Sequence, residues 1–270
     1  MFAFFTAPSA SRLPLSARPS ASTAPVLDLP ALVGAAAWAR LPAAVQRRFG
    51  TAHADVTYQG HLDMRCSAIG HVYAALARLW GGPLTHLNTT AVPTTVRVSS
   101  NGCGGVVWER RFHADATGRA PGAGRATHAA SDCRTVRSTK ELGADGGLLE
   151  RTDGGLAMSL DVLEEDGALV FRSRRFWWVV GGLRVAVPAL LTPGTCTVAH
   201  TDLGGGLFRF TLSMDHPWWG ETFYQSGVFV DPHTDSNDHP GADTHTHTTP
   251  GTPSDSLGTD SLTHSEGTPS

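Results

Sequence analysis

The chain has 270 residues, a net charge of −3 and 41% hydrophobic residues, which allows one large domain or two small ones. Residues 233–270 hold six acidic residues and no Lys or Arg, so removing them from the net charge leaves +3 for residues 1–232. That charge is too small for a nucleic-acid-binding surface. No apolar run reaches the roughly 18 residues of a membrane-spanning helix. We therefore expect no nucleic-acid partner and no membrane span.

The two ends of the chain differ in composition from its middle. Residues 1–28 are rich in Ala, Ser and Pro and contain no acid before Asp28. Such a segment is either an organellar targeting peptide or a disordered terminus of a cytoplasmic protein. Residues 233–270 form an acidic His/Thr/Ser tail with almost no apolar residues, which predicts disorder. The sequence thus predicts a disordered or targeting segment over 1–30, one β-rich globular domain over 31–232, and a disordered tail.

Helical patterns are few and lie near the start of the domain. Pro30 precedes a short helix over 31–40, because Pro is favoured in a first helical turn, and a second short helix covers 42–49. An alternating run over 56–65 predicts a strand. Ser67 can cap a helix over 68–81, whose apolar residues follow the helical period. We expect this amphipathic helix to be a packed core element, with Leu76 buried.

From residue 92 onward, nearly every segment alternates between apolar and polar residues, which predicts strands. Asp166-Gly167 is a hairpin signal between two of them. Many closely spaced strands with one amphipathic helix predict an α+β domain. Its sheet is expected to be mainly antiparallel and curved or barrel-like. The expected strands cover residues 92–98, 106–113, 127–138, 148–152, 156–162, 168–180, 195–201, 207–214 and 221–229.

No pattern predicts a metal site or a cofactor. The cysteines Cys66, Cys103, Cys133 and Cys196 are far apart and form no CxxC, so we expect them to be reduced and structural. The histidines before the tail are scattered, and His245-Thr246-His247 falls in the tail. The sequence also lacks a GxSxG nucleophile elbow and a phosphate-binding P-loop.

Two strand faces mix aromatic and polar side chains and predict a ligand pocket: Trp108, Arg110 and Phe112 on one, and Glu221, Phe223 and Gln225 on the other. Buried polar groups need a partner or a ligand, and the planar fork of Arg110 suits a carboxylate or phosphate. This favours a binding module for a small apolar or amphipathic molecule. Alternatively, Arg110 pairs with Glu150 or Glu221 and the aromatic residues are core. We expect Arg110 and Glu221 to share one interior cluster.

His216 and Glu221 are candidates for a catalytic pair. A histidine near a carboxylate can act in general acid–base catalysis, which would fit an isomerase or a hydrolase. The other interpretation is that His216 caps the turn before Pro217 by a hydrogen bond to the backbone. The absence of a nucleophile nearby in the sequence favours this second interpretation.

Several short stretches in a fixed order resemble the bacterial domain-of-unknown-function family numbered 4166. They are Leu41-Pro42, residues 47–49, 58–60, 108–112, 167–171, 208–210, His216-Pro217 and residues 220–229, and the resemblance covers about residues 38–231. It implies a domain that is sometimes appended to NAD(P)-binding reductase-like proteins, and it implies no established activity. This sequence has no Rossmann half, so a reductase partner would be a separate protein.

Overall fold

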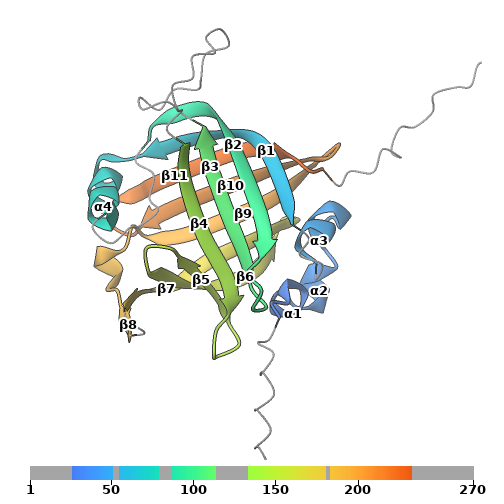
Figure 1. Cartoon of the computed structure of the whole chain (residues 1–270), viewed down its shortest axis with the longest axis horizontal. Helices are drawn as coiled ribbons and strands as arrows, with labels where there is room; N and C mark the ends of the chain where they lie inside the picture. Colours follow the sequence, from blue (N-terminus) through green and yellow to red (C-terminus); the bar gives the residue numbers. More distant parts are fainter. Residues whose placement is uncertain (1–25, 51–54, 79–86, 114–132, 181–182, 233–270) are drawn as a thin grey trace, which may run out of the picture. The chain divides into compact units, whose positions relative to one another are not determined.

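The computed structural model describes residues 26–50, 55–78, 87–113, 133–180 and 183–232. The chain divides into two units, residues 1–234 and 235–270, and the second lies wholly outside the described residues. The predictions for residues 1–25 and for the tail 233–270 therefore also lie outside them. Within the first unit the dominant element is a mostly antiparallel β-sheet with few helices (Figure 1).

The sheet closes into a barrel of ten strands. Each ring strand pairs with the next ring strand along the chain. The ring is closed by β1 (Val56–Cys66), which pairs antiparallel with β11 (Gly220–Val230). An even number of strands lets the first and last pair antiparallel. The other eight strands are β2 (Thr89–Ser100), β3 (Val106–His113), β4 (Cys133–Leu142), β5 (Leu148–Thr152), β6 (Leu156–Glu165), β7 (Ala168–Val180), β9 (Thr195–Gly204) and β10 (Leu207–His216).

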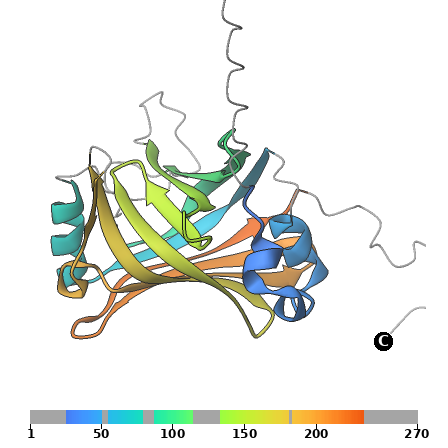
Figure 2. The ribbon, with the colours of Figure 1, turned by 90° about the horizontal axis from the view of Figure 1, so that it is seen from below.

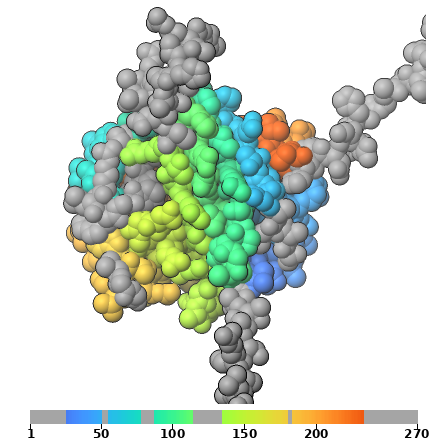
Figure 3. All heavy atoms as spheres, in the orientation of Figure 1, coloured from blue at the N-terminus to red at the C-terminus, as the bar shows by residue number. Residues whose placement is uncertain are grey.

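Local sequence explains how these strands are joined. Asp166 and Gly167 have φ angles of 50° and 77°, as a two-residue type I′ hairpin turn requires, and they join β6 to β7 as predicted. The short β8 (Leu183–Ala186) pairs only with β7, outside the ring. Within the ring, β7 pairs with β9 across the intervening β8. Figure 3 shows β1 to β4 running side by side across one face of the barrel.

Three short helices lie at one end of the barrel: α1 (Leu29–Val33), α2 (Ala35–Trp38) and α3 (Ala43–Phe49). The helix predicted over 31–40 is broken at Gly34, whose φ is 88°. The buried Phe49 at the end of α3 lies 5.9 Å from the Trp108 ring and 4.8 Å from the His200 ring. This helical group therefore packs onto the aromatic interior of the barrel.

Helix α4 (Ala68–Arg78) lies at the opposite end (Figures 1 and 2). Its last predicted residues, 79–81, fall outside the described part of the chain. The prediction that its large apolar side chains are buried is wrong, since Leu76 is 47% exposed and Val72 is 51% exposed. Gly70 and Ala74 are the buried positions. The helix thus contacts the barrel through these small residues and the partly buried Tyr73, whereas Val72 and Leu76 face outward.

Candidate functional site

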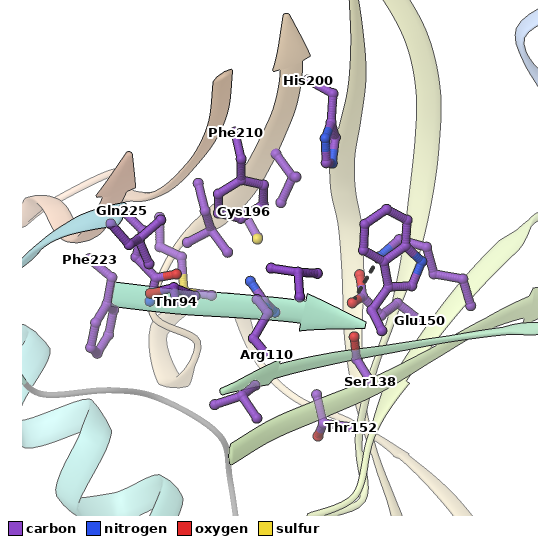
Figure 4. A pocket seen from close by; sticks show the side chains of 18 of the residues that line it. Thr94, Arg110, Ser138, Glu150, Thr152, Cys196, His200, Phe210, Phe223 and Gln225 are labelled. Atoms are coloured by element: carbon purple, nitrogen blue, oxygen red, sulfur yellow. Dashed lines mark ion pairs between the residues drawn. The ribbon is translucent and has the colours of Figure 1, made fainter. Parts of the chain in front are cut away.

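The barrel encloses a cavity with a water-accessible volume of about 90 Å³. Six phenylalanines dominate its wall: Phe112, Phe176, Phe208, Phe210, Phe223 and Phe229. They face inward because side chains alternate between the two sides of each strand. A smaller set of polar residues comes from β2, β3, β4, β5, β9 and β11, among them Thr94, Arg110, Ser138, Glu150, His200 and Gln225 (Figure 4).

An ion pair is buried in this wall. Lys140 Nζ lies 3.0 Å from Glu150 Oε1 across the β4–β5 pair, and both side chains are more than nine-tenths buried. Burial opposes ionisation of Glu150, but the charge of Lys140, the Ser138 hydroxyl and the charge of Arg110 together outweigh it and hold its pKa below the ordinary value. The lysine also lies 5.2 Å from the centre of the Trp108 ring. Glu150 is therefore a carboxylate, and Lys140 neutralises it.

Arg110 extends from β3 into the same cavity (Figure 4). Burial lowers its pKa, and the charge of Glu150 offsets part of that effect. Its Nε is buried and has no hydrogen-bond partner among the described residues. The guanidinium carbon lies 5.6 Å from the centre of the Phe210 ring. Arg110 is thus a cation in an aromatic interior with hydrogen-bonding capacity left over.

A second buried pair lies where α3 meets the barrel. Arg48 Nη2 is 3.3 Å from Asp231 Oδ2, and its guanidinium carbon is 3.9 Å from the centre of the Phe208 ring. Burial, together with Asp231, raises the pKa of Tyr58 to about 12. The Arg48–Asp231 pair fixes the helical end of the barrel without adding net charge to the interior.

Two other titratable groups in the wall are held neutral. Burial, aided by the charge of Arg48, keeps the pKa of His200 well below its ordinary value of 6.5. Its Nδ1 has no hydrogen-bond partner among the residues that the structure describes. Burial and the charge of Glu150 raise the pKa of Cys196 to about 12. Neither an imidazolium nor a thiolate therefore forms here near neutral pH, so the interior lacks an activated nucleophile at these positions.

Five of the six predicted ligand-binding residues line this one cavity: Trp108, Arg110, Phe112, Phe223 and Gln225. The sixth, Glu221, does not. Its side chain is 41% exposed and pairs with Arg65 at 3.2 Å. The prediction of an interior Arg110–Glu221 cluster is therefore wrong, and Glu150 is the carboxylate that acts on Arg110.

A β-bulge explains the position of Glu221. Met214 pairs with Phe223 but Asp215 pairs with Glu221, so Thr222 is the extra residue on β11. One extra residue reverses the alternation beyond it, and Glu221 turns to solvent. Thr222 Oγ1 lies within hydrogen-bond distance of the carbonyl oxygens of Pro193 and Met214, which holds the bulge in place.

The structure does not bring His216 and Glu221 together. His216 is buried, and its Nδ1 accepts a hydrogen bond from the Trp218 backbone N–H at 3.2 Å. Its ring stacks at 5.9 Å on that of Trp219. Glu221 lies in solvent beside Arg65. The interpretation of His216 as a turn cap therefore fits the geometry, and a shared acid–base site does not.

Sequence reasoning missed Lys140, Ser138 and Thr152 as cavity residues and named Glu150 only as a partner for Arg110. The alternation of side chains along β4 and β5 could have identified these residues. Ser138 and Lys140 share a face of β4, as do Glu150 and Thr152 on β5. The chain has only this one lysine.

A wider groove with a water-accessible volume of about 340 Å³ lies at the α4 end. It is bounded by α4, by β7 and by the segment 187–193 that contains the short helix η1 (Ala189–Leu191). Leu156 and Phe176 line both this groove and the barrel cavity. Those two side chains are therefore the partition between the two spaces.

One further cluster has the residue types of a cysteine nucleophile site. Cys66 Sγ lies 3.4 Å from His71 Nδ1, and Asn88 Nδ2 lies 3.5 Å from His71 Nε2. Burial raises the pKa of Cys66, however. Asn88 Oδ1 accepts from the Cys66 backbone N–H at 2.7 Å, and Asn88 Nδ2 donates to the Cys66 carbonyl at 3.1 Å. This cluster ties the end of β1, and burial keeps the thiol of Cys66 protonated near neutral pH.

Within the described ranges no three His, Cys, Asp or Glu side chains are grouped so that they could hold a metal ion. No helix in that part of the chain has the length and apolar character needed to cross a membrane. Comparisons with curated proteins and with solved structures found no match. Residues 41–229 match the model of the family described as Domain of unknown function (DUF4166), and the chain therefore belongs to that family.

Proposed function

We propose that the barrel is a binding module for a small apolar or amphipathic molecule held in its interior. The observation that carries this proposal is a cavity inside a closed barrel with mainly aromatic and aliphatic walls and a few convergent polar groups. Ligand pockets generally have this composition. Trp108, Phe112 and Phe223 would supply apolar contacts, and Arg110 and Gln225 would orient the polar end.

The size of the two spaces bears on the ligand. A cavity needs a water-accessible volume of about 10–15 Å³ to hold one water molecule. The barrel cavity of about 90 Å³ therefore admits only a small group. The adjoining groove of about 340 Å³ is larger. Rotation of Leu156 and Phe176 would join the two spaces and admit a longer molecule.

Binding of the neutral fluorescent dye N-phenylnaphthylamine tests the proposal. Val198 lines the cavity on β9, so Val198→Phe fills part of it. Thr197→Phe introduces the same aromatic ring at the neighbouring position, whose side chain points away from the cavity. We expect saturable binding by the wild type, at least about tenfold weaker binding by Val198→Phe, and unchanged binding by Thr197→Phe. No saturable binding by the wild type, or equal binding by both variants, would contradict the proposal.

A second candidate function is docking onto a partner protein, an NAD(P)-dependent reductase as the family resemblance implies. The observation in its favour is a group of exposed apolar side chains at the α4 end: Val72, Leu76, Leu190, Leu191, Trp218 and Trp219. The Tyr73 hydroxyl donates to the Leu190 carbonyl at 3.0 Å, and the Tyr73 ring lies 6.1 Å from that of His216. These contacts link the helix, the segment 187–193 and the Trp218–Trp219 turn. Exposed apolar patches of this kind mark interaction sites.

The docking function is tested with a purified reductase of the NAD(P)-binding type that the resemblance implies. We expect Trp218→Ser combined with Trp219→Ser to weaken the complex at least about tenfold, because aromatic side chains dominate interface energetics. Leu207→Ser combined with Val230→Ser is the matched control, since both residues are exposed apolar positions on β10 and β11 away from this group. No complex, or equal loss in both double variants, removes this candidate.

A further inference from the structure

We infer that the ligand of the barrel carries a single carboxylate, which binds Arg110, and an apolar tail that passes Leu156 and Phe176 into the groove beneath α4. This inference rests on the proposed binding function and goes beyond it by naming the chemical class of the ligand.

The first step is the charge balance of the interior. Lys140 is neutralised by Glu150 at 3.0 Å, and Arg48 by Asp231 at 3.3 Å. His200 is held neutral by burial. Arg110 has no ion pair within hydrogen-bonding distance among the described residues. The cavity wall formed by these residues therefore carries one uncompensated positive charge.

The second step is the hydrogen-bonding capacity of Arg110. A guanidinium has five N–H donors in a planar fork that matches a carboxylate with two parallel hydrogen bonds. The buried Nε of Arg110 finds no hydrogen-bond partner in the described part of the chain, and the side chain points into the cavity (Figure 4). A buried cation is costly unless it is paired and hydrogen-bonded. An anionic ligand group would supply both the charge and the acceptors.

The third step is the choice between anions. A carboxylate brings one negative charge, which equals the uncompensated charge of the wall. A phosphate monoester brings about −1.5 to −2 charges at pH 7 and would add repulsion with Glu150, which lies close enough to act on Arg110. The small cavity also favours the more compact group. The interior thus matches a monoanionic carboxylate better than a phosphate.

The fourth step is the position of the tail. Apolar side chains, mainly phenylalanine, valine and leucine, make up most of the cavity wall, and its polar residues are a minority. Beyond Leu156 and Phe176 the groove is also apolar, with Leu76, Trp178 and Leu191 among its walls. A chain that starts at Arg110 and leads outward would therefore bury carbon along its whole length.

Three ligands of equal chain length test the inference: decanoate, decanol and decyl phosphate, each measured by displacement of N-phenylnaphthylamine. We expect the wild type to bind decanoate at least about tenfold more tightly than decanol, and more tightly than decyl phosphate. Arg110→Met should remove the preference for decanoate over decanol and leave the affinity for decanol within about threefold of the wild type. Arg209→Met, at an exposed position on β10, is the matched control and should keep the preference.

The outcomes separate the two proposals. Equal binding of decanoate and decanol by a wild type that binds the dye overturns the carboxylate inference and leaves the binding function in place. Tighter binding of decyl phosphate overturns the choice of anion. Absence of all binding overturns both proposals.

If Arg110→Met does not fold, Arg110→Lys tests the carboxylate inference instead, because lysine keeps the charge without the planar fork. Its preference for decanoate should be smaller than that of the wild type, and an unchanged preference contradicts a forked contact.

Discussion

Lys140 is the only lysine in the chain, and it lies inside the barrel at 3.0 Å from Glu150. A buried charge is tolerated when it is paired, and removal of one partner strands the other. Among the described residues that line the cavity, Glu150 is the one acid, beside the cations Lys140, Arg110 and Arg48. The interior electrostatics therefore depend on this single carboxylate.

Glu150→Gln and Arg110→Met should have opposite effects on stability. The first leaves Lys140 and Arg110 without a counter-charge, so the free energy of unfolding should fall by about 3–5 kcal/mol. The second removes the uncompensated cation, so the free energy of unfolding should equal or exceed that of the wild type. Urea denaturation of both variants measures the difference. A large loss of stability in Arg110→Met would mean that Arg110 is a structural partner of Glu150 and not a free anchor.

His200 should make stability depend on pH. Burial holds its pKa in the folded protein well below 6.5, whereas the unfolded chain binds a proton at this residue below about pH 6.5. The unfolded state then binds more protons, so stability falls as pH decreases through this window. In His200→Phe this contribution disappears. The melting temperature of His200→Phe minus that of the wild type, measured by calorimetry, should therefore increase as the pH is lowered from 8 to 5. A difference that does not change with pH would contradict a neutral, buried His200.

Residue alternation predicted five cavity residues and failed for Glu221, and the reason is local. Alternation assigns a face only while the strand stays in register, and the extra residue Thr222 reverses it. Nothing in the stretch from Gly220 to Gln225 marks a bulge, because the bulge depends on the carbonyl groups of Pro193 and Met214. The Lys140–Glu150 ion pair was equally hidden, since it depends on the register between β4 and β5, although Glu150 had been named as a possible partner of Arg110.

At the scale of elements, α4 shows how a helical period can be correct while its buried face is wrong. The period of Val72, Tyr73 and Leu76 predicted a core helix. The barrel instead contacts the positions of Gly70 and Ala74. A Cβ on Gly70 would overlap the carbonyl oxygen of Thr222 and lie 2.9 Å from Cys66 Sγ. Close approach of the backbones fixes this helix, and hydrophobicity alone does not reveal it.

Gly70→Ala should therefore destabilise the protein more than Leu76→Ala. The added methyl group must push α4 away from Thr222, and overpacking of this kind costs about 1–3 kcal/mol. Leu76 is 47% exposed, so Leu76→Ala should cost less than about 1 kcal/mol. Thermal unfolding of both variants measures the order of the two effects. A larger loss in Leu76→Ala would show that α4 packs through its large apolar residues after all.

At the scale of the whole molecule, the decisive feature is the pairing of β1 with β11. The sequence predicted a curved or barrel-like antiparallel sheet, and the β6–β7 hairpin followed from the local turn signal Asp166-Gly167. Closure could not be predicted in the same way, because it joins residues such as Gly60 and Phe229 that are far apart in the chain. A Cβ on Gly60 would lie 2.6 Å from a ring carbon of Phe229, so the aromatic ring packs on the glycine across the closing pair.

Because β11 ends at Val230 and pairs with both β1 and β10, the barrel is complete before residue 233. Residues 233–270 contain almost no apolar side chains, and their predicted disorder lies outside the described residues. Deletion of 233–270 should change the melting temperature by less than about 2 °C, because little apolar surface is lost. Deletion of 220–270, which also removes β11, opens the ring and should abolish cooperative unfolding. Calorimetry of both truncations tests this, and a larger fall in the first would show that the tail binds the barrel.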